Sequence, residues 1–203
     1  MSKQNLITSP IGRTEWMKLF TADYKFDDAG LFGGKLNIDN TDAQGIMKQL
    51  DALSADSLAK AAEETGKPAS KLRVNPPYEV CQETGDVTIK LKLKENVNGR
   101  NGSFTQKPKV VDSQGHPIVS EIPVWNGSRV RVSFTPVLYY TAMAGAGVSL
   151  RLFAVQIIEA LSGGDDSAAN LFDKVDDGFT VSEEQVTGLA AVSDTEEFDD
   201  IPF

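Results

Sequence analysis

The sequence is poor in the residues that support covalent or metal-based chemistry. It contains one cysteine, Cys81, and one histidine, His116. A single cysteine excludes an internal disulfide and a cysteine-rich zinc site, so we expect Cys81 to be a free thiol, packed as a small hydrophobic residue. His116 stands in a Gly-His-Pro turn and is expected to be exposed and inert. We therefore predict no catalytic residues, no bound metal and no cofactor.

Long apolar runs are also missing. None reaches the roughly 18 residues that a transmembrane helix needs. The first residues, MSKQNLITSPIG, hold no apolar stretch long enough for a signal peptide. These absences predict a protein that stays in the cytoplasm of the cell that makes it, without membrane association.

Positive charge is scarce near the C-terminus. The chain has 203 residues, with 20 lysines and arginines against 29 aspartates and glutamates. Residues 165–203 hold 12 of these acids and one base, a net charge of −11, whereas residues 1–164 carry +2. Such asymmetry indicates a body with a separate acidic tail. We predict a folded domain over residues 1–182 and a disordered acidic tail over residues 183–203, which are poor in large apolar side chains.

Two stretches in the first half show helical spacing of apolar residues. Residues 43–53 follow capping residues at Asn40–Asp42, and residues 57–64 follow Ser54 and Asp56. Gly66 and then Pro68 end the pattern. The sequence therefore predicts two helices.

Apolar residues alternate with polar ones from Leu72 onward, which is typical of half-buried strands. The clearest case is Val87–Lys94, and Arg129–Phe134 repeats it. Residues 108–111 and 118–124 frame the turn sequence Asp-Ser-Gln-Gly and predict a hairpin. Residues 148–158 are mostly apolar and predict a central strand. Together these patterns predict a mainly β fold, a small antiparallel β-barrel with an inserted helical segment.

Basic residues occupy the polar face of two predicted strands. Lys90, Lys92 and Lys94 are spaced about 6.6–7 Å apart along one strand, close to the phosphate repeat of an extended single strand of DNA. A solvated surface explains one such strand more simply, but Arg129 and Arg131 repeat the arrangement on another. Two basic faces in one barrel favour a nucleic-acid groove, with a salt-bridged surface as the alternative.

Aromatic side chains would suit such a groove to single strands, because unpaired bases stack on aromatic faces. Trp16, in a polar context, and at least one of the adjacent Tyr139 and Tyr140 are expected to be exposed, whereas Phe134 and Phe153 stand on apolar faces and are assigned to the core. The residues predicted to contact DNA are Arg13, Trp16, Tyr24, Lys35, Lys71, Arg73, Tyr78, Lys90, Lys92, Lys94, Phe104, Lys107, Lys109, Arg129, Arg131, Tyr139 and Tyr140.

The last residues form a further motif. An acidic run ends in Asp199, Asp200, Ile201, Pro202 and Phe203. Charge alone does not account for apolar residues at the extreme end. A terminal Phe with its carboxylate is a peptide ligand in form, able to fill an apolar pocket beside a basic residue. We predict that residues 199–203 bind partner proteins.

Several segments, in this order and spacing, resemble the T7-type phage single-stranded-DNA-binding proteins. The segments are Thr8–Gly12, Val110–Gly115, Ile122–Val124, Gly127–Val132, Gly145–Ala146 and Val148–Leu152. The resemblance covers roughly residues 5–180 and implies an OB-fold barrel, preference for single strands and recruitment of phage replication proteins by the acidic tail. It is also compatible with a homodimer. The final Asp-Ile-Pro-Phe departs from that family and resembles the tail tip of bacterial single-stranded-DNA-binding proteins, which extends the hypothesis to host replication and repair proteins.

Two functions remain open at this point. The first is a sequence-tolerant single-stranded-DNA-binding protein that protects the strand in the bacterial host's cytoplasm and gathers replication, recombination and repair proteins. The alternative is an interaction protein whose acidic tail mimics DNA and occupies a nucleic-acid enzyme. DNA binding separates them, because a pure mimic does not bind single strands.

Overall fold

The computed structural model describes residues 5–25, 27–99 and 102–161. The chain divides into one unit of residues 1–163 and another of residues 164–203. The second unit, the predicted boundary at residue 182 and the tail tip all lie outside the described residues. Within the described part, no helix combines the length and apolarity needed to cross a membrane.

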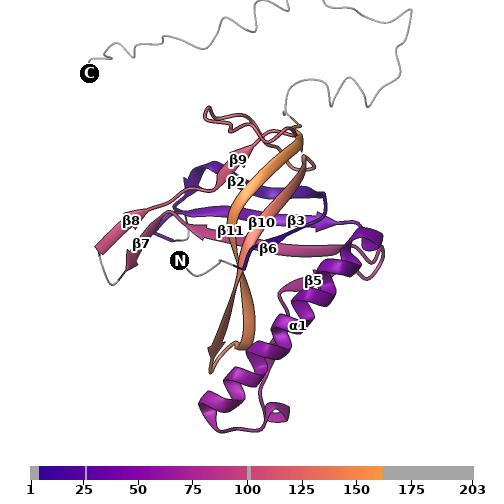
Figure 1. Cartoon of the computed structure of the whole chain (residues 1–203), viewed down its shortest axis with the longest axis vertical. Helices are drawn as coiled ribbons and strands as arrows, with labels where there is room; N and C mark the ends of the chain where they lie inside the picture. The colour runs from indigo at the N-terminus through magenta and orange to yellow at the C-terminus, as the bar shows by residue number, and fades with distance from the viewer. Residues whose placement is uncertain (1–4, 26, 100–101, 162–203) are drawn as a thin grey trace, which may run out of the picture. The chain divides into compact units, whose positions relative to one another are not determined.

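Five long strands close into a ring (Figure 1). Around the ring each strand pairs with the next, and β10 returns to β2 through two residue pairs only. The pairing of β6 with β11 is parallel and the other ring pairings are antiparallel. This is the partly open five-stranded barrel of the OB fold, which confirms the predicted mainly β architecture. In ring order the strands are β2 (Gly12–Asp23), β3 (Leu31–Ile38), β6 (Val87–Lys94), β11 (Gly145–Glu159) and β10 (Arg129–Thr141).

Period-two alternation decides which side chains enter the barrel. In β6 the apolar residues from Val87 to Leu93 are buried, and Lys90, Lys92 and Lys94 are exposed. Phe134 is fully buried, as predicted. Phe153 is only half-buried, so its assignment to the core was wrong. The reason is a register shift, because Leu152 pairs with Phe134 and Ala154 with Ser133, which leaves Phe153 as an extra residue on β11.

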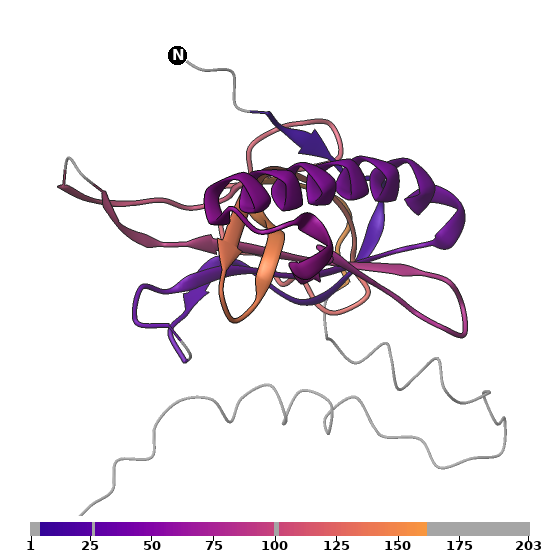
Figure 2. The ribbon, with the colours of Figure 1, turned by 90° about the horizontal axis from the view of Figure 1, so that it is seen from below.

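One helix replaces the two that were predicted. α1 runs without a break over Asn40–Thr65 and ends at Gly66, which adopts the left-handed conformation. Ser54 does not cap a second helix, because its buried hydroxyl donates to the Leu50 carbonyl 2.9 Å away in the preceding turn. The buried stripe of α1 packs on the part of β10 and β11 that extends beyond the barrel (Figures 1 and 2).

Short elements complete the described part of the chain. Residues 118–124 contain no strand, so the predicted hairpin was wrong in its second half. Its first half pairs in parallel with β11 instead, while Val111 forms a single bridge to Pro117, which has no N–H to extend the ladder. The elements are β1 (Ile7–Thr8), η1 (Ala69–Lys71), β4 (Val74–Asn75), β5 (Tyr78–Val80), β7 (Asn96–Gly99), β8 (Gly102–Thr105) and β9 (Lys109–Val111).

Cys81 is a free thiol, as predicted, but it is exposed rather than packed. It lies in the turn between β5 and β6, where its N–H donates to the Asp86 carbonyl at 2.8 Å. Hydrogen bonding from the side chain of Thr84, and then from backbone amides, lowers the pKa of the thiol. His116 is exposed, as expected.

Candidate nucleic-acid interface

A groove of about 580 Å³ lies between the outer faces of β3, β6 and β11 and the segment that leads into β5. We call it the tyrosine groove, because Tyr78 and Tyr139 form part of its lining. Lys35, Lys90 and Lys92 also line it, and Glu79 is its one carboxylate. The remaining lining residues are Asn75, Pro76, Pro77, Thr88, Val148, Ser149 and Leu150.

Hydrogen bonds hold the two tyrosines of this groove. The Tyr78 hydroxyl donates to Oδ1 of Asp51 on α1 at 2.7 Å, and Nδ2 of Asn75 donates to the Tyr139 hydroxyl at 2.7 Å. The bond to the Asp51 carboxylate raises the pKa of Tyr78, so the ring stays neutral at physiological pH. Both rings are therefore positioned before any ligand arrives.

The lysines of the tyrosine groove differ in their partners. Lys35 Nζ lies 3.2 Å from Glu15 Oε1, and this hydrogen bond lowers the pKa of the Glu15 carboxyl. Lys90 and Lys92 form no ion pair with any carboxylate in the described part of the chain. Their charges are consequently available to an anionic ligand.

A second groove, of about 410 Å³, continues beyond Lys92. We call it the phenylalanine groove, after Phe104 and Phe153. Lys109 Nζ lies 5.2 Å from the centre of the Phe153 ring, a cation–π distance, and Arg151 donates to Gln106 Oε1 at 3.2 Å. Among the residues that the structure describes, no carboxylate lines it. The other lining residues are Leu93, Lys107, Thr135, Val137 and Leu152.

The two grooves join across the parallel pair β6–β11. Lys92 in the first is the register partner of Arg151 in the second, and adjacent strands lie about 4.8 Å apart. We call the joined grooves the basic channel. In the part of the chain that the structure describes, six cationic side chains and a single carboxylate line it.

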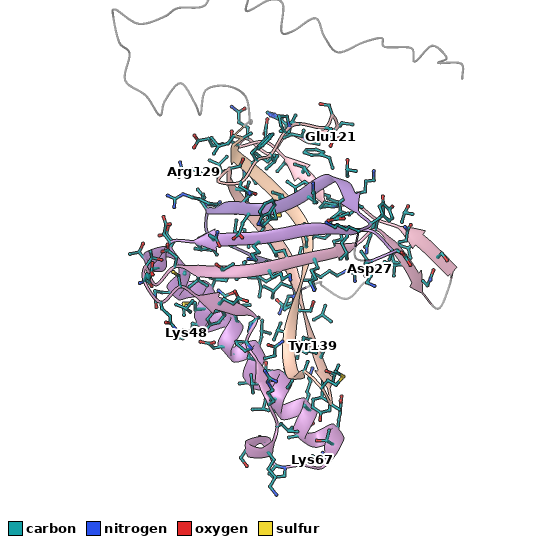
Figure 3. The ribbon with its side chains drawn as sticks, turned by 180° about the vertical axis from the view of Figure 1, so that it is seen from behind. Asp27, Lys48, Lys67, Glu121, Arg129 and Tyr139 are labelled. Atoms are coloured by element: carbon teal, nitrogen blue, oxygen red, sulfur yellow. The ribbon has the colours of Figure 1, made fainter. Side chains whose placement is uncertain are left out.

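The position of the channel matches the place where OB folds bind oligonucleotides. That place is the face of the second and third barrel strands, between the loop that joins strands 1 and 2 and the loop that joins strands 4 and 5. In this chain the strands are β3 and β6, and the loops are 24–30 and 142–144. Figure 3 looks at the molecule from behind, where β2, β3 and β6 cross in front of β10 and β11. It labels Asp27 in the first loop and Tyr139 near the second.

Eight of the residues predicted from sequence meet in the channel: Lys35, Tyr78, Lys90, Lys92, Phe104, Lys107, Lys109 and Tyr139. Lys94 continues their row but forms an ion pair with Asp27 at 2.9 Å. Tyr24 is 52% exposed in the loop before β3, and its hydroxyl is hydrogen-bonded to the Glu95 carboxylate.

Sequence reasoning missed Arg151 and Phe153. Arg151 is exposed between the buried Leu150 and Leu152, the same alternation that singled out the lysines of β6. This alternation lies within the mostly apolar residues 148–158, which predict a central strand but do not by themselves indicate a basic outer face. Phe153 comes two residues after Arg151 and continues the same alternation, a signal equally hidden within the apolar run.

Other predicted residues lie elsewhere. Arg129 and Arg131 begin β10, and Arg129 is ten residues before Tyr139, roughly 33 Å along the strand; Figure 3 shows it at the opposite end of β10. Arg129 pairs with Glu159 at 3.7 Å, and Arg13, its register partner on β2, pairs with Asp39 at 3.4 Å. The two basic strand faces therefore do not form one groove.

The remaining predicted residues also lie outside the lining of the channel. Lys71 and Arg73 are exposed in and after η1. The carbonyl of Arg73 accepts the Ala146 N–H at 2.9 Å, which places this segment beside the start of β11. Tyr140 is half-buried on β10. Trp16 stands 71% exposed on β2.

Comparison with known proteins gives one family. The family described as "Enterobacter phage Enc34, ssDNA-binding protein" matches residues 4–183. A search of curated protein sequences finds no match.

Solved structures share the fold. The crystal structure of gp2.5, a single-stranded DNA binding protein encoded by bacteriophage T7, matches with a TM-score of 0.70 and 23% identity, over 89% of this chain and 100% of that one. The single-stranded DNA-binding protein from bacteriophage Enc34 in complex with ssDNA matches with a TM-score of 0.54 and 15% identity, over 79% of this chain and 89% of that one.

Proposed function

The chain belongs to the family of the Enterobacter phage Enc34 ssDNA-binding protein, and from that premise we propose that it binds single-stranded DNA in the basic channel. As a member of that family the chain is a binding protein and not an enzyme. The observation that carries the proposal is the lining of the channel, where six cations face one carboxylate and four aromatic rings stand among them.

The cations and the aromatic rings of the channel would contact different parts of a DNA strand. The cations contact phosphates and release counterions, which supplies affinity that is independent of sequence. Tyr78, Tyr139, Phe104 and Phe153 offer faces on which bases stack, and stacking tolerates every base. The proposed activity is therefore sequence-tolerant coating and protection of single strands.

The acidic C-terminal residues supply the regulatory part of the proposal. Residues 183–203 contain seven carboxylates and no base, and they end in Phe203. We propose that they compete with DNA for the channel and recruit replication, recombination and repair proteins in the cytoplasm of the bacterial host. A pull-down of host proteins with the intact chain and with a chain lacking Phe203 tests recruitment. Equal recovery of host proteins by the two chains would show that Phe203 is not needed for recruitment.

The homodimer suggested by the family resemblance is a separate part of the proposal. Sedimentation equilibrium of the full chain measures it directly. A single species at the mass of one chain, across the working concentration range, would exclude the dimer.

The test of DNA binding is fluorescence anisotropy of a labelled oligothymidine at several salt concentrations. We expect saturable binding that weakens steeply with salt, with a slope of about −0.7 per phosphate contacted. Lys92→Glu should weaken binding by about tenfold or more and lower the slope. The matched control is Lys48→Glu, the same charge change on the exposed surface of α1. Absence of binding by the unaltered chain would reject the proposal in favour of a DNA mimic.

A further inference from the structure

β2 contains a bulge that the basic channel does not explain. Glu15 pairs with Lys35 and Lys18 pairs with Gly33, so three residue steps on β2 match two on β3. Trp16, in the bulge, has φ of 53°, and it is the one non-glycine residue with positive φ in the described part of the chain. A bulky residue rarely adopts this left-handed conformation, and bulges commonly re-aim a side chain near a functional site.

Neighbouring groups hold the bulge in place. The Trp16 N–H donates to Oδ1 of Asn126 at 2.7 Å, and the Thr14 hydroxyl donates to the Trp125 carbonyl at 2.8 Å. Across the sheet, a Cβ on Gly34 would lie 2.6 Å from the Trp16 carbonyl oxygen. The close approach of β3 to the bulge therefore requires glycine at position 34.

This arrangement leaves two indole rings in solvent. Trp16 is 71% exposed and Trp125 is 55% exposed, and hydrogen bonds join their backbone segments. They are the two tryptophans of the chain. We call the pair the tryptophan platform.

A row of the barrel surface leads from the basic channel to this platform. Lys92 is the register partner of Gly33, and Gly33 is the register partner of Lys18. Both lysines are exposed, and Gly33 places no side chain between them. Lys18 in turn lies two residues from Trp16. Positive charge thus continues from the channel toward the platform.

We propose that Trp16 and Trp125 form a second base-stacking site for the strand that occupies the basic channel, with Lys18 contacting a phosphate between the two sites. This inference rests on the proposed function and adds an aromatic site on β2 and the segment before β10. Exposed indoles joined to a cationic surface suit an unpaired base. A self-association surface would depend instead on other exposed apolar residues of the segment before β10, such as Val119, which is 92% exposed.

Tryptophan emission reports on this site alone, because both tryptophans belong to it. Trp125→Phe leaves Trp16 as the single tryptophan, and Trp16→Gly leaves Trp125. Each variant is titrated with an oligothymidine of about twenty nucleotides, longer than the span of one OB fold, while anisotropy of a labelled copy follows binding independently. We expect emission to fall in both variants as binding saturates. Saturated binding with unchanged emission would overturn the platform and leave the channel intact, whereas absence of binding would overturn both.

Affinity provides the second test. Trp16→Gly removes the ring and places the residue that favours positive φ in the bulge, so the melting temperature should not fall. Its affinity for the oligothymidine should fall about tenfold, as should that of Trp125→Ser, while Val119→Ser, an exposed apolar control from the segment before β10, should bind normally. Normal affinity of both tryptophan variants, or loss of a dimer in sedimentation equilibrium without loss of affinity, would overturn the proposal.

Discussion

Asp27 neutralises the last lysine of the β6 row. Its carboxylate lies 2.9 Å from Lys94 Nζ, and the hydrogen bond from Lys94 lowers the pKa of Asp27. Lys94 is exposed and Asp27 is half-buried at the surface, so solvent screens the pair and it contributes little to folding. We expect its effect to be on the ligand, because a carboxylate beside the proposed phosphate path would repel DNA.

We predict that Asp27→Asn strengthens DNA binding several-fold at low salt, since it releases Lys94 and removes a negative charge. Anisotropy titrations at two salt concentrations measure this. The advantage should shrink as salt rises, because exposed charges are screened. Asp56→Asn, on the exposed surface of α1, is the control and should bind as the unaltered chain does.

The lowered pKa predicts how pH acts on the same pair. Asp27 stays ionised until the pH falls below the ordinary aspartate value of about 3.9. The ratio of the affinities of Asp27→Asn and the unaltered chain should therefore stay constant between pH 5 and 8. It should approach one only in more acidic solution. A ratio that changes across neutral pH would show that another group controls Lys94.

Substitution of Gly34 tests how closely the β2 bulge packs against β3. An added methyl group would lie 2.6 Å from the Trp16 carbonyl oxygen and 2.7 Å from the Met17 Cα. Gly34→Ala should lower the free energy of unfolding by about 1–3 kcal/mol, measured by urea denaturation. Gly45→Ala is the control. Nothing lies within 4 Å of its added Cβ in α1, so it should stabilise the protein by about 0.5–1 kcal/mol.

At the scale of elements, the decisive contact is between α1 and the β10–β11 hairpin. The hairpin extends beyond the barrel and carries Tyr139 into the tyrosine groove. The buried Ser57 hydroxyl on α1 lies 3.1 Å from the Tyr139 carbonyl and 2.9 Å from the Gly147 carbonyl. Helix and hairpin are thus joined at the residue that lines the groove.

We predict that Ser57→Ala costs about 1–2 kcal/mol of stability, because buried carbonyls lose a donor. DNA affinity should also fall, since Tyr139 is less firmly placed. Ser54→Ala is the matched control, because the Ser54 hydroxyl bonds only within α1, and its effect should be small. Equal losses in the two variants would assign the effect to the helix alone.

For the whole molecule, the distribution of charge matters more than its sum. The net charge is −9, yet residues 1–164 carry +2 and include the basic channel. Under the proposed competition, an acidic segment on the same chain would act as a competitor at high effective concentration. Overall acidity is therefore compatible with DNA binding.

We predict that deletion of residues 183–203 strengthens binding of oligothymidine at low salt and has little effect at high salt, where both interactions are screened. Anisotropy titrations of the two chains measure it. A full-length chain with the seven carboxylates of this segment changed to amides should behave like the deletion. If neither change strengthens binding at low salt, the competition hypothesis fails.

The periodic direction of side chains within single strands and helices could be predicted from the sequence. Side-chain direction follows a period of two in strands and 3.6 in helices, so the exposed lysines of β6 and the helical character of residues 43–64 were predictable. The segregation of charge followed from counting acidic and basic residues along the sequence. Whether the helical stretch is one helix or two was not predictable, because a serine caps a new helix or remains within a longer one, and here the buried Ser54 hydroxyl bonds to the Leu50 carbonyl within α1.

Which residues meet in space depends on how the strands pair. Arg151 joins Lys92 because β6 and β11 pair in parallel, and Arg129 is kept from the channel because it begins β10 at the far end. Trp16 is exposed because a register shift interrupts the alternation of β2, and a register shift in β11 leaves the half-buried Phe153 without a partner on β10. Strand register depends on partners distant in sequence, and no local pattern specifies it. The lysine row and the exposure of Trp16 were therefore predictable from local sequence, whereas the set of residues that meet in the channel and the bulge that joins Trp16 to the segment of Trp125 were not.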